Sequence, residues 1–593
     1  MLTLPASSPL SSRLHRWLAG GVRVISWALL VAGLLLGMAW AALHFWIVPR
    51  IADFRPALES LARQSLGVPV RIGGLSAQST GWVPSFELRD IALLDSQGRT
   101  ALSLPRVVVA ISLRSVLQLR LDQLVLDAPE LDVRLNADGR WQVAGLDWPQ
   151  AHQGNSTAAD WLFSQREVVV RGGRLRWSRE TAPAHGASAN SLSSPEVITL
   201  GLQQVDLVLR NSPRHHDLRV DATPPEGWGE RFVLMGRFRR SLLSTHAGQW
   251  ADWSGQAYAY FPQVDVAQLH PHIPEAMASG VRLDAGLGQV RLWSDIDKGR
   301  WTGGVADVNL TGLNAQLAPQ RPSLVFERFS GRLGGKVHAK GFEFFTRDLA
   351  FVDAQGLDWP GGNLALEYTH AQGKQPAKGR IQADQLDLLT LREMVLRMPV
   401  AKALHDRLQE QSIAGQVSAL QWRWQGDWQQ PTQYEAQLSV KNLLLRHSAP
   451  SPDTLSWPGL QGADVKLNLT QAGGEIDLRM AQGGMVFLPG VLALPEVPVR
   501  SLQAFAQWEK KNGPNGPLWQ VPQWRLKLGN ADLQGEWHGQ WRENPTGQGP
   551  GLLDLQGLIQ QADAASAHRY LPLVLPESVR HYVRDAVVKG SYT

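Results

Sequence analysis

The chain has 593 residues, no cysteine, and 58 basic against 53 acidic side chains, a formal net charge of +5. The absence of cysteine excludes disulfide bonds and thiolate metal sites. A modest charge without a dense basic run argues against nucleic acid as a partner. The length allows several domains, but no strong linker divides the chain, so we expect one extended architecture.

The first predicted element is a transmembrane helix over residues 24–47. The twenty residues 24–43 carry no charge, and at 1.5 Å per residue such a helix spans about 30 Å, the thickness of a bilayer's hydrocarbon core. A cleaved signal peptide is the alternative, because residues 39–41 fit its cleavage site; however, the apolar run exceeds the ~7 to 15 residues of an ordinary signal-peptide core. A long folded domain translocates largely regardless of its charge, so residues 1–23 are predicted to be a cytoplasmic tail.

An amphipathic lead-in helix is predicted over residues 48–66, where Phe54, Leu58 and Leu61 recur at helical spacing. After residue 66 the hydrophobic period changes to two, and alternating segments fill the rest of the chain. Each such strand has one apolar and one polar face, which is typical of antiparallel sheets. The predicted fold class is therefore mainly β, with one N-terminal transmembrane helix, a long curled antiparallel sheet over residues 67–593, and a few short helices.

The short helices are predicted near residues 265–280, 385–412 and 563–589. Residues 265–274 and 563–572 share the pattern D-x-A-x-x-H-x-x-[I/L]-P. Identical spacing over ten positions indicates an internal repeat, and the middle helix is a weaker copy.

The polar residues of this pattern allow two interpretations. Asp265, His270, Asp563 and His568 could form a polar site for a ligand head group. Helix capping is the favoured interpretation, because an aspartate accepts hydrogen bonds from the free N–H groups of the first helical turn.

Signals for catalysis are missing from the sequence. We find no nucleophile elbow, no zinc-protease motif, no P-loop and no dinucleotide fingerprint. The cluster of His215, His216 and Asp217 has no third ligand at a recognisable spacing, which argues against metal. The sequence therefore predicts no enzyme, no catalytic residues, no cofactor and no metal.

Residues 66–77 and 84–91, with the helices before them, resemble the start of the AsmA-like envelope proteins, specifically the YhdP branch. Residues 568–572, followed by a helix and a glycine-led strand, resemble the recurrent motif of that branch. The middle copy departs from this motif, because it lacks the His and Leu-Pro positions. Members of the branch are longer, so we expect these residues to be an N-terminal part of a longer protein.

The resemblance implies a single-pass protein of the bacterial inner membrane with most of its chain in the periplasm. Residues 67–593 would form a β-taco-type groove, built of modules, that conducts phospholipid toward the outer membrane. The implied partners are phospholipid, the inner membrane and other outer-membrane or envelope proteins. Two alternatives differ in class: an envelope structural or outer-membrane assembly factor, whose apolar faces would close on one another, and a glycan-binding protein that uses some of the 24 tryptophans.

The strand pattern also predicts which residues share the lipid-facing side. Period two shows common faces but does not show which face lies inside, so each residue has plain sheet core as its alternative role. The expected lipid-groove lining is Leu131, Val133, Leu135, Val205, Leu207, Leu209, Val465, Leu467, Leu469, Ile476 and Leu478.

Overall fold

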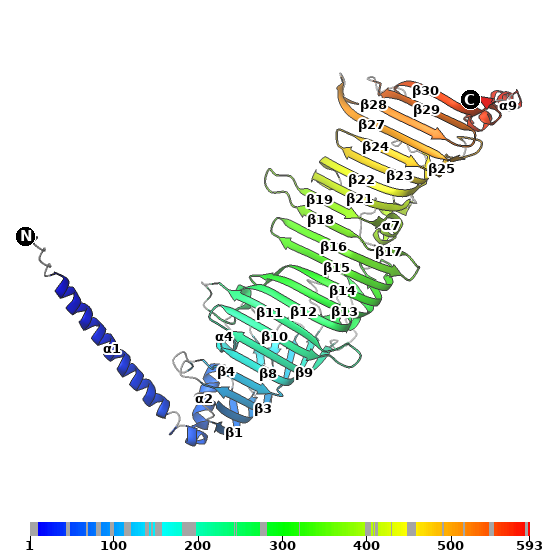
Figure 1. The fold of residues 1–593 in the computed structure, drawn as a ribbon. Helices are drawn as coiled ribbons and strands as arrows, with labels where there is room; N and C mark the ends of the chain where they lie inside the picture. Colours follow the sequence, from blue (N-terminus) through cyan, green and yellow to red (C-terminus); the bar gives the residue numbers. More distant parts are fainter. Residues whose placement is uncertain are drawn as a thin grey trace, which may run out of the picture. The chain divides into compact units, whose positions relative to one another are not determined.

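A computed structural model shows a β-rich chain with few helices (Figure 1). It describes residues 10–42, 45, 48–66, 69–78, 85–94, 100–111, 115, 120–136, 141–143, 146–148, 157–180, 197–241, 244, 246–272, 281–318, 321–397, 405–406, 408–409, 413–428, 430–446, 458–488, 491–513, 516–544, 551–586 and 591–592.

Three helical elements open the chain: α1 (Leu10–Ala42), η2 (Val48–Phe54) and α2 (Arg55–Leu66). Helix α1 includes most of the segment predicted to cross the membrane. Most of its described apolar side chains are exposed, for example Val24 and Leu29. Among the residues that the structure describes, no helix has the combined length and hydropathy of a membrane span.

The chain forms two compact units. Unit 1 comprises residues 1–261 and 295–301, and unit 2 comprises residues 262–294 and 302–593. The strands and helices of unit 1 after α2 are β1 (Val70–Gln78), β2 (Ser85–Leu94), β3 (Thr100–Ala110), β4 (Gln123–Asp127), β5 (Glu130–Leu135), β6 (Trp141–Val143), β7 (Leu146–Trp148), α4 (Thr157–Ser164), β8 (Glu167–Glu180), β9 (Val197–Asn211), β10 (His215–Thr223), β11 (Phe232–Arg240), η3 (Trp250–Asp252) and most of β12 (Trp253–Asp265).

Unit 2 has the same kind of architecture as unit 1. Its elements are α5 (Val266–Leu269), η4 (His270–His272), β13 (Arg282–Asp297), β14 (Arg300–Gln316), β15 (Leu324–His338), β16 (Gly341–Asp353), β17 (Asp358–Pro360), β18 (Asn363–Thr369), β19 (Lys378–Asp384), β20 (Leu386–Asp387), α7 (Leu388–Leu396), β21 (Ile413–Gly426), β22 (Pro431–Leu445), β23 (Gly459–Thr470), β24 (Gly473–Met480), β25 (Gly483–Val486), β26 (Glu496–Val499), β27 (Ser501–Gly513), β28 (Gly516–Gly529), β29 (Leu533–Arg542), β30 (Leu552–Asp563), η5 (Ala564–Tyr570), α9 (Glu577–Ala586) and β31 (Ser591–Tyr592).

The sheet is mixed, which corrects the prediction of a purely antiparallel sheet. Strand β8 runs parallel to both β4 and β5, whereas β9 runs antiparallel to it. Between β5 and β8 the chain passes through β6, β7 and helix α4. A crossover of this kind returns the chain in its original direction, so the next strand pairs in parallel. Period two in the sequence carries no information about such a crossover.

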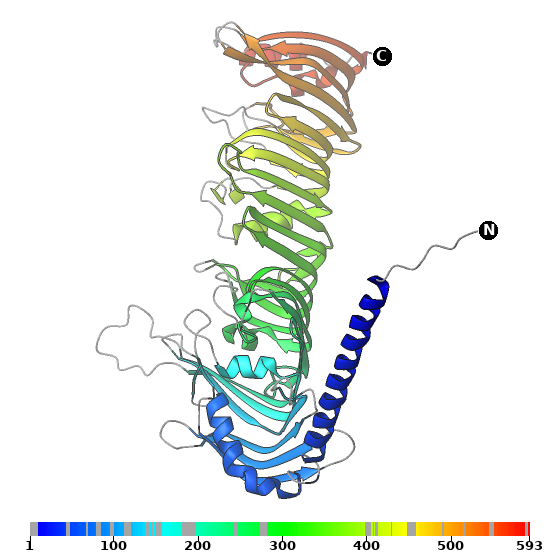
Figure 2. The ribbon, with the colours of Figure 1, turned by 90° about the vertical axis from the view of Figure 1, so that its left-hand side faces the viewer.

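Strands in both units bend at single residues with a positive φ angle. Gln204, Asp348 and Asn442 have φ angles of 47°, 49° and 51°, and the pairing of β22 with β23 shifts register beside Asn442. Asn442 donates its backbone N–H to the Asp464 carboxylate at 3.0 Å, which fixes the irregular backbone. An extra residue of this kind bends its strand and increases the local twist. The strands of each unit are accordingly curved (Figure 2).

Candidate functional site: an apolar sheet face

The candidate site is the apolar face of the sheet in unit 2, because paired strands place apolar side chains directly opposite one another there. One row of opposed residues consists of Phe344, Leu366, Ile381, Trp422, Ala436, Leu469 and Gly474. The next row consists of Thr346, Leu364, Ala383, Leu420, Leu438, Leu467, Ile476, Ala506 and Trp524. Side chains in such rows contact their neighbours across the strands. The register therefore builds one continuous apolar surface from β16 to β28.

This surface is partly open to solvent, because most members of the two rows are only half-buried. Phe342 and Phe344 on β16 keep 36% and 39% of their surface exposed, and Leu555 on β30, beyond the two rows, keeps 52%. By contrast, residues beside the strand bends are buried, for example Val440 and Ala463. Large exposed apolar patches on a protein mark contact with another apolar partner or ligand. The bends thus hold a packed core, while the outer parts of the strands offer an uncovered apolar face.

The opposite face of the same strands is polar and rich in ion pairs. Arg479 Nε lies 2.9 Å from Asp477 Oδ1, and Lys527 Nζ lies 2.9 Å from Glu536 Oε1. The hydrogen bond from Lys527 holds the pKa of Glu536 below its ordinary value. The two faces of the sheet therefore differ sharply in polarity, and this difference identifies the face that can bind an apolar molecule.

Unit 1 carries an equivalent apolar face, but short helices cover part of it. Its opposed residues include Leu88, Val107, Leu126, Val170, Leu207, Val220 and Leu234. Leu58 of α2 and Trp161 and Phe163 of α4 pack against the buried cluster beside this row. Val168 and Leu209 in that cluster are only 2% and 3% exposed. This part of the sheet is a closed core.

Helix α4 is fastened over this core by its acidic residue. Asp160 accepts the backbone N–H of Gly248 at 2.7 Å, and its other oxygen lies 2.7 Å from His246 Nδ1. A Cβ atom at position 248 would come within 2.6 Å of the Ala159 backbone, so only glycine allows the loop to approach the helix this closely. The cover therefore depends on contacts from the segment between β11 and β12.

All eleven residues predicted to line the groove lie on described strands, and none of them is fully exposed. The structure brings five of them together on the apolar face of unit 2: Val465, Leu467, Leu469, Ile476 and Leu478. Leu207 and Leu209 lie at the covered core of unit 1, and Val205 lies further along the same strand, opposite Gly173. Leu131, Val133 and Leu135 lie on β5, where β8 pairs with them in parallel. Lipid contact at these positions stays a prediction.

Sequence reasoning missed two parts of this arrangement. The aromatic residues Phe342 and Phe344 on β16 belong to the apolar face, and their alternation with Glu343 was a usable signal. Helix α4 was also missed, although the apolar run of residues 161–163 breaks period two. Both omissions concern how the face is lined or covered, which depends on tertiary packing.

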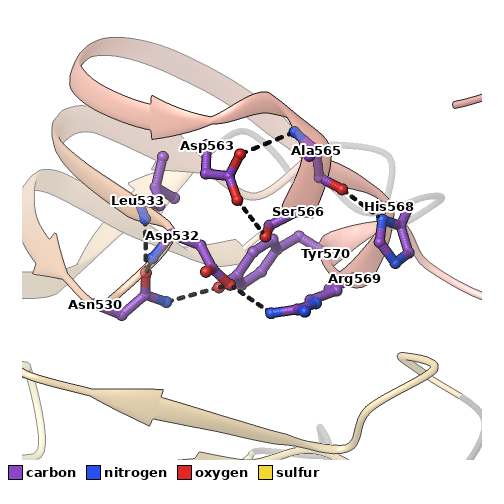
Figure 3. A network of polar contacts seen from close by, with 9 residues as sticks. All are labelled: Asn530, Asp532, Leu533, Asp563, Ala565, Ser566, His568, Arg569 and Tyr570. Atoms are coloured by element: carbon purple, nitrogen blue, oxygen red, sulfur yellow. Dashed lines mark hydrogen bonds and ion pairs between the residues drawn. The ribbon is translucent and has the colours of Figure 1, made fainter. Parts of the chain in front are cut away.

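The repeated aspartates cap helices, as the favoured interpretation predicted. Asp265 accepts the N–H of Ala267, and Asp387 accepts the N–H of Thr390. Asp563 accepts hydrogen bonds from the Ala565 N–H and the Ser566 hydroxyl (Figure 3).

The third copy of the repeated motif, which begins at Asp563, is also hydrogen-bonded to the turn between β28 and β29. Tyr570 donates its hydroxyl to Asp532 and accepts a hydrogen bond from Asn530, while Arg569 pairs with the same aspartate (Figure 3). Burial raises the pKa of Tyr570. His568 Nδ1 lies 2.9 Å from the Ala565 carbonyl oxygen, so this network holds the helical turn in place.

The histidine cluster on β10 is divided by the alternation of the strand. His215 and Asp217 are exposed, whereas His216 is 1% exposed, stacks on Trp253 at 4.4 Å and has Nδ1 2.7 Å from Asn211 Oδ1. Burial lowers the pKa of His216 to about 4, so the ring is neutral at pH 7. The three side chains therefore do not converge on one site.

Comparison with known proteins identifies a matching family and a curated relative. A family model described as YhdP protein matches residues 13–593. The intermembrane phospholipid transporter YhdP of Escherichia coli is 22% identical in a match that covers 68% of this chain and 29% of the relative. The chain therefore spans less than a third of the length of that curated relative. No solved structure matches the chain significantly.

Proposed function

We propose, from the premise that the chain belongs to the YhdP protein family, that it carries phospholipid from the inner membrane toward the outer membrane. The family match confirms the resemblance that the sequence motifs predicted. The E. coli relative is described as an intermembrane phospholipid transporter. For this chain, which covers 29% of that relative, phospholipid conduction is our proposal.

The observation that carries this proposal is the uncovered apolar face of unit 2. Directly opposed apolar residues continue from β16 to β28, and the reverse face is charged. At about 0.8 kcal/mol per methylene, exposing some thirty methylenes of a lipid to water costs on the order of 20 kcal/mol. A face that contacts the acyl chains at every strand removes most of this barrier, while the head group remains in water.

We further propose that residues 24–47 anchor the protein in the inner membrane, with residues 1–23 cytoplasmic and residues 67–593 periplasmic. Exposed apolar side chains along α1, such as Val24 and Leu29, support a lipid-facing helix. The cysteine-free chain allows a direct test. A single cysteine at Asp132 should react with an impermeant maleimide in cells with a permeabilised outer membrane, and one at Ser12 should not. Labelling of Ser12→Cys under these conditions would overturn the orientation.

An envelope structural or assembly factor is the second candidate function. The closed core under α2 and α4 in unit 1 favours it, because a covered apolar face stabilises a scaffold and carries no lipid. This candidate predicts that the apolar face of unit 2 is covered by a protein partner in cells.

Lipid that copurifies with the protein separates the two candidates. Leu438 lies within the apolar row, and its neighbour Gln437 points to the polar face. Leu438→Asp should lower the amount of copurified phospholipid about tenfold, since a buried charge opposes acyl chains. Gln437→Asp should leave it unchanged. Equal phospholipid in both variants, with the wild-type pattern of proteolytic fragments, would contradict conduction along this face.

A further inference from the structure

A depression of about 600 Å³ lies at the ends of strands β18, β19, β21, β22 and β23 in unit 2. These strands follow one another in the sheet (Figure 1). The charged residues that line the depression are Glu367, Lys378, Arg380, Arg423 and Glu435. Positively and negatively charged side chains therefore lie close together at the ends of these strands.

The strand register places these charges in an unfavourable order. Glu367 lies opposite Arg380, Arg380 lies opposite Arg423, and Arg423 lies opposite Glu435. Two arginines that face each other directly across strands repel and destabilise the pair. Within the described part of the chain, none of these four side chains forms an ion pair or a hydrogen bond, and the Arg380 Nε atom is buried without a partner. The charges of this row therefore remain free to bind a ligand.

At two other places on the polar face, neighbouring opposite charges do pair. Arg479 contacts Asp477, and Lys527 contacts Glu536, each at 2.9 Å. The unpaired row therefore differs from these two pairs of the same surface.

Aromatic residues adjoin the depression on the apolar side. Tyr368 lies opposite Gly379, which lies opposite Trp424, which lies opposite Tyr434. Trp424 and Tyr434 line the depression; Trp424 is 5% exposed, and its indole Nε1 has no hydrogen-bond partner. A buried N–H group without a partner is rare in native structures. Aromatic rings with a polar atom suit the boundary between apolar and wet surroundings.

We infer that this depression binds a zwitterionic head group, a phosphodiester carrying a primary ammonium, of a lipid whose acyl chains lie on the apolar face. The inference rests on the proposed function. Lys378 stands in the last paired row, at the strand ends, where the two faces of the sheet meet. A head group that bends around these strand ends reaches the charged row.

The charges of the row match the two ends of such a head group. Arg380, Arg423 and Lys378 offer donors to the phosphate oxygens, and guanidinium groups bind phosphate in a bidentate manner. Glu367 and Glu435 flank the arginines and can accept hydrogen bonds from the ammonium group. A phosphate alone between two carboxylates would be repelled, so the mixed row favours a ligand with both charges.

Native mass spectrometry of the full chain in detergent tests this site. The probes are three lipids with the same acyl chains: phosphatidylethanolamine, phosphatidylglycerol and diacylglycerol. We expect phosphatidylethanolamine to bind best. The double variant Arg380→Gln, Arg423→Gln should lose about tenfold in binding of both phospholipids, and diacylglycerol binding should stay unchanged. Glu367→Gln with Glu435→Gln should abolish the preference for phosphatidylethanolamine over phosphatidylglycerol.

Lys466→Gln is the matched control, because Lys466 is an exposed cation of the same polar face outside the depression. Equal binding of the three lipids, or a preference that survives both double variants, would overturn the head-group site. Equal binding of soluble O-phosphoethanolamine, with no gain from acyl chains, would overturn its assignment to a lipid. Failure of all three lipids to bind, diacylglycerol included, would instead contradict the proposed function.

Discussion

Units 1 and 2 build the same kind of apolar sheet face and use it differently. In unit 1 residues of α2 and α4 pack on the face, and Leu209 is 3% exposed. In unit 2 the corresponding rows stay partly open, and Phe344 is 39% exposed. The difference shows that strand alternation alone does not decide between a core and a lipid path. The packing of helices α2 and α4 on the strands decides it.

The largest expected effect of a single substitution is at the covered face. Leu209→Ala should destabilise unit 1 by about 3 kcal/mol, because the residue is buried and leaves a cavity. Leu467→Ala on the partly open face of unit 2 should cost about 1 kcal/mol. Hydrogen exchange of peptides from β8 to β10 and from β22 to β24 measures both. Equal destabilisation by the two substitutions would contradict the difference in burial between the two units.

The pH dependence of stability should also differ between the units. Burial lowers the pKa of His216 to about 4, so the folded state prefers the neutral ring. Its contribution is fully present above about pH 6.5, the unfolded value, and is lost as the pH falls toward 4. At pH 5 unit 1 should be about 2 kcal/mol less stable than at pH 7.

Hydrogen exchange of β10 and β11, corrected for intrinsic rates, checks this loss of stability. In the variant His216→Phe the loss between pH 7 and pH 5 should be much smaller. An unchanged pH profile in that variant would show that other groups control the acid sensitivity of unit 1.

The contacts of Asp160 give a smaller and more local prediction. Asp160→Ala removes the acceptor for the Gly248 N–H and the partner of His246, which should cost about 1 to 2 kcal/mol. Helix α4 should then be cleaved faster by protease near residues 157–164. Fragments from unit 2 should appear at the wild-type rate, and unchanged cleavage of α4 would show that Asp160 does not hold the cover.

Ion pairs on the polar face should matter least. Lys527→Ala removes an exposed pair with Glu536 and should leave stability nearly unchanged, because solvent screens the pair. Copurified phospholipid should not change either. A marked loss of lipid in this variant would indicate that the polar face, and not the apolar face, contacts the ligand.

Much of the fold could be predicted from residue patterns. Alternation such as Val465, Leu467 and Leu469 predicted strands and their common face, because period two is a local property. The aspartate caps at Asp265 and Asp563 followed from a local hydrogen-bond rule.

Three features could not be predicted in this way. The parallel pairing of β8 depends on a crossover, the cover on unit 1 depends on packing of α4, and the row of unpaired charges around Arg380 depends on strand register. Each arises from residues far apart in the sequence. Hydrophobic patterns therefore predicted which residues form the apolar face, but not which parts of that face are covered.

Site-specific photo-crosslinking in cells tests the central claim most directly. A photoreactive residue would replace Phe344 or Leu467 on the open face, Leu209 under the cover, and Lys466 on the polar face, and mass spectrometry would identify attached phospholipid. We predict phospholipid adducts at Phe344 and Leu467 and none at Leu209 or Lys466. Adducts at Lys466 equal to those at Leu467, or none at either residue of the open face in intact protein, would contradict a lipid path along unit 2.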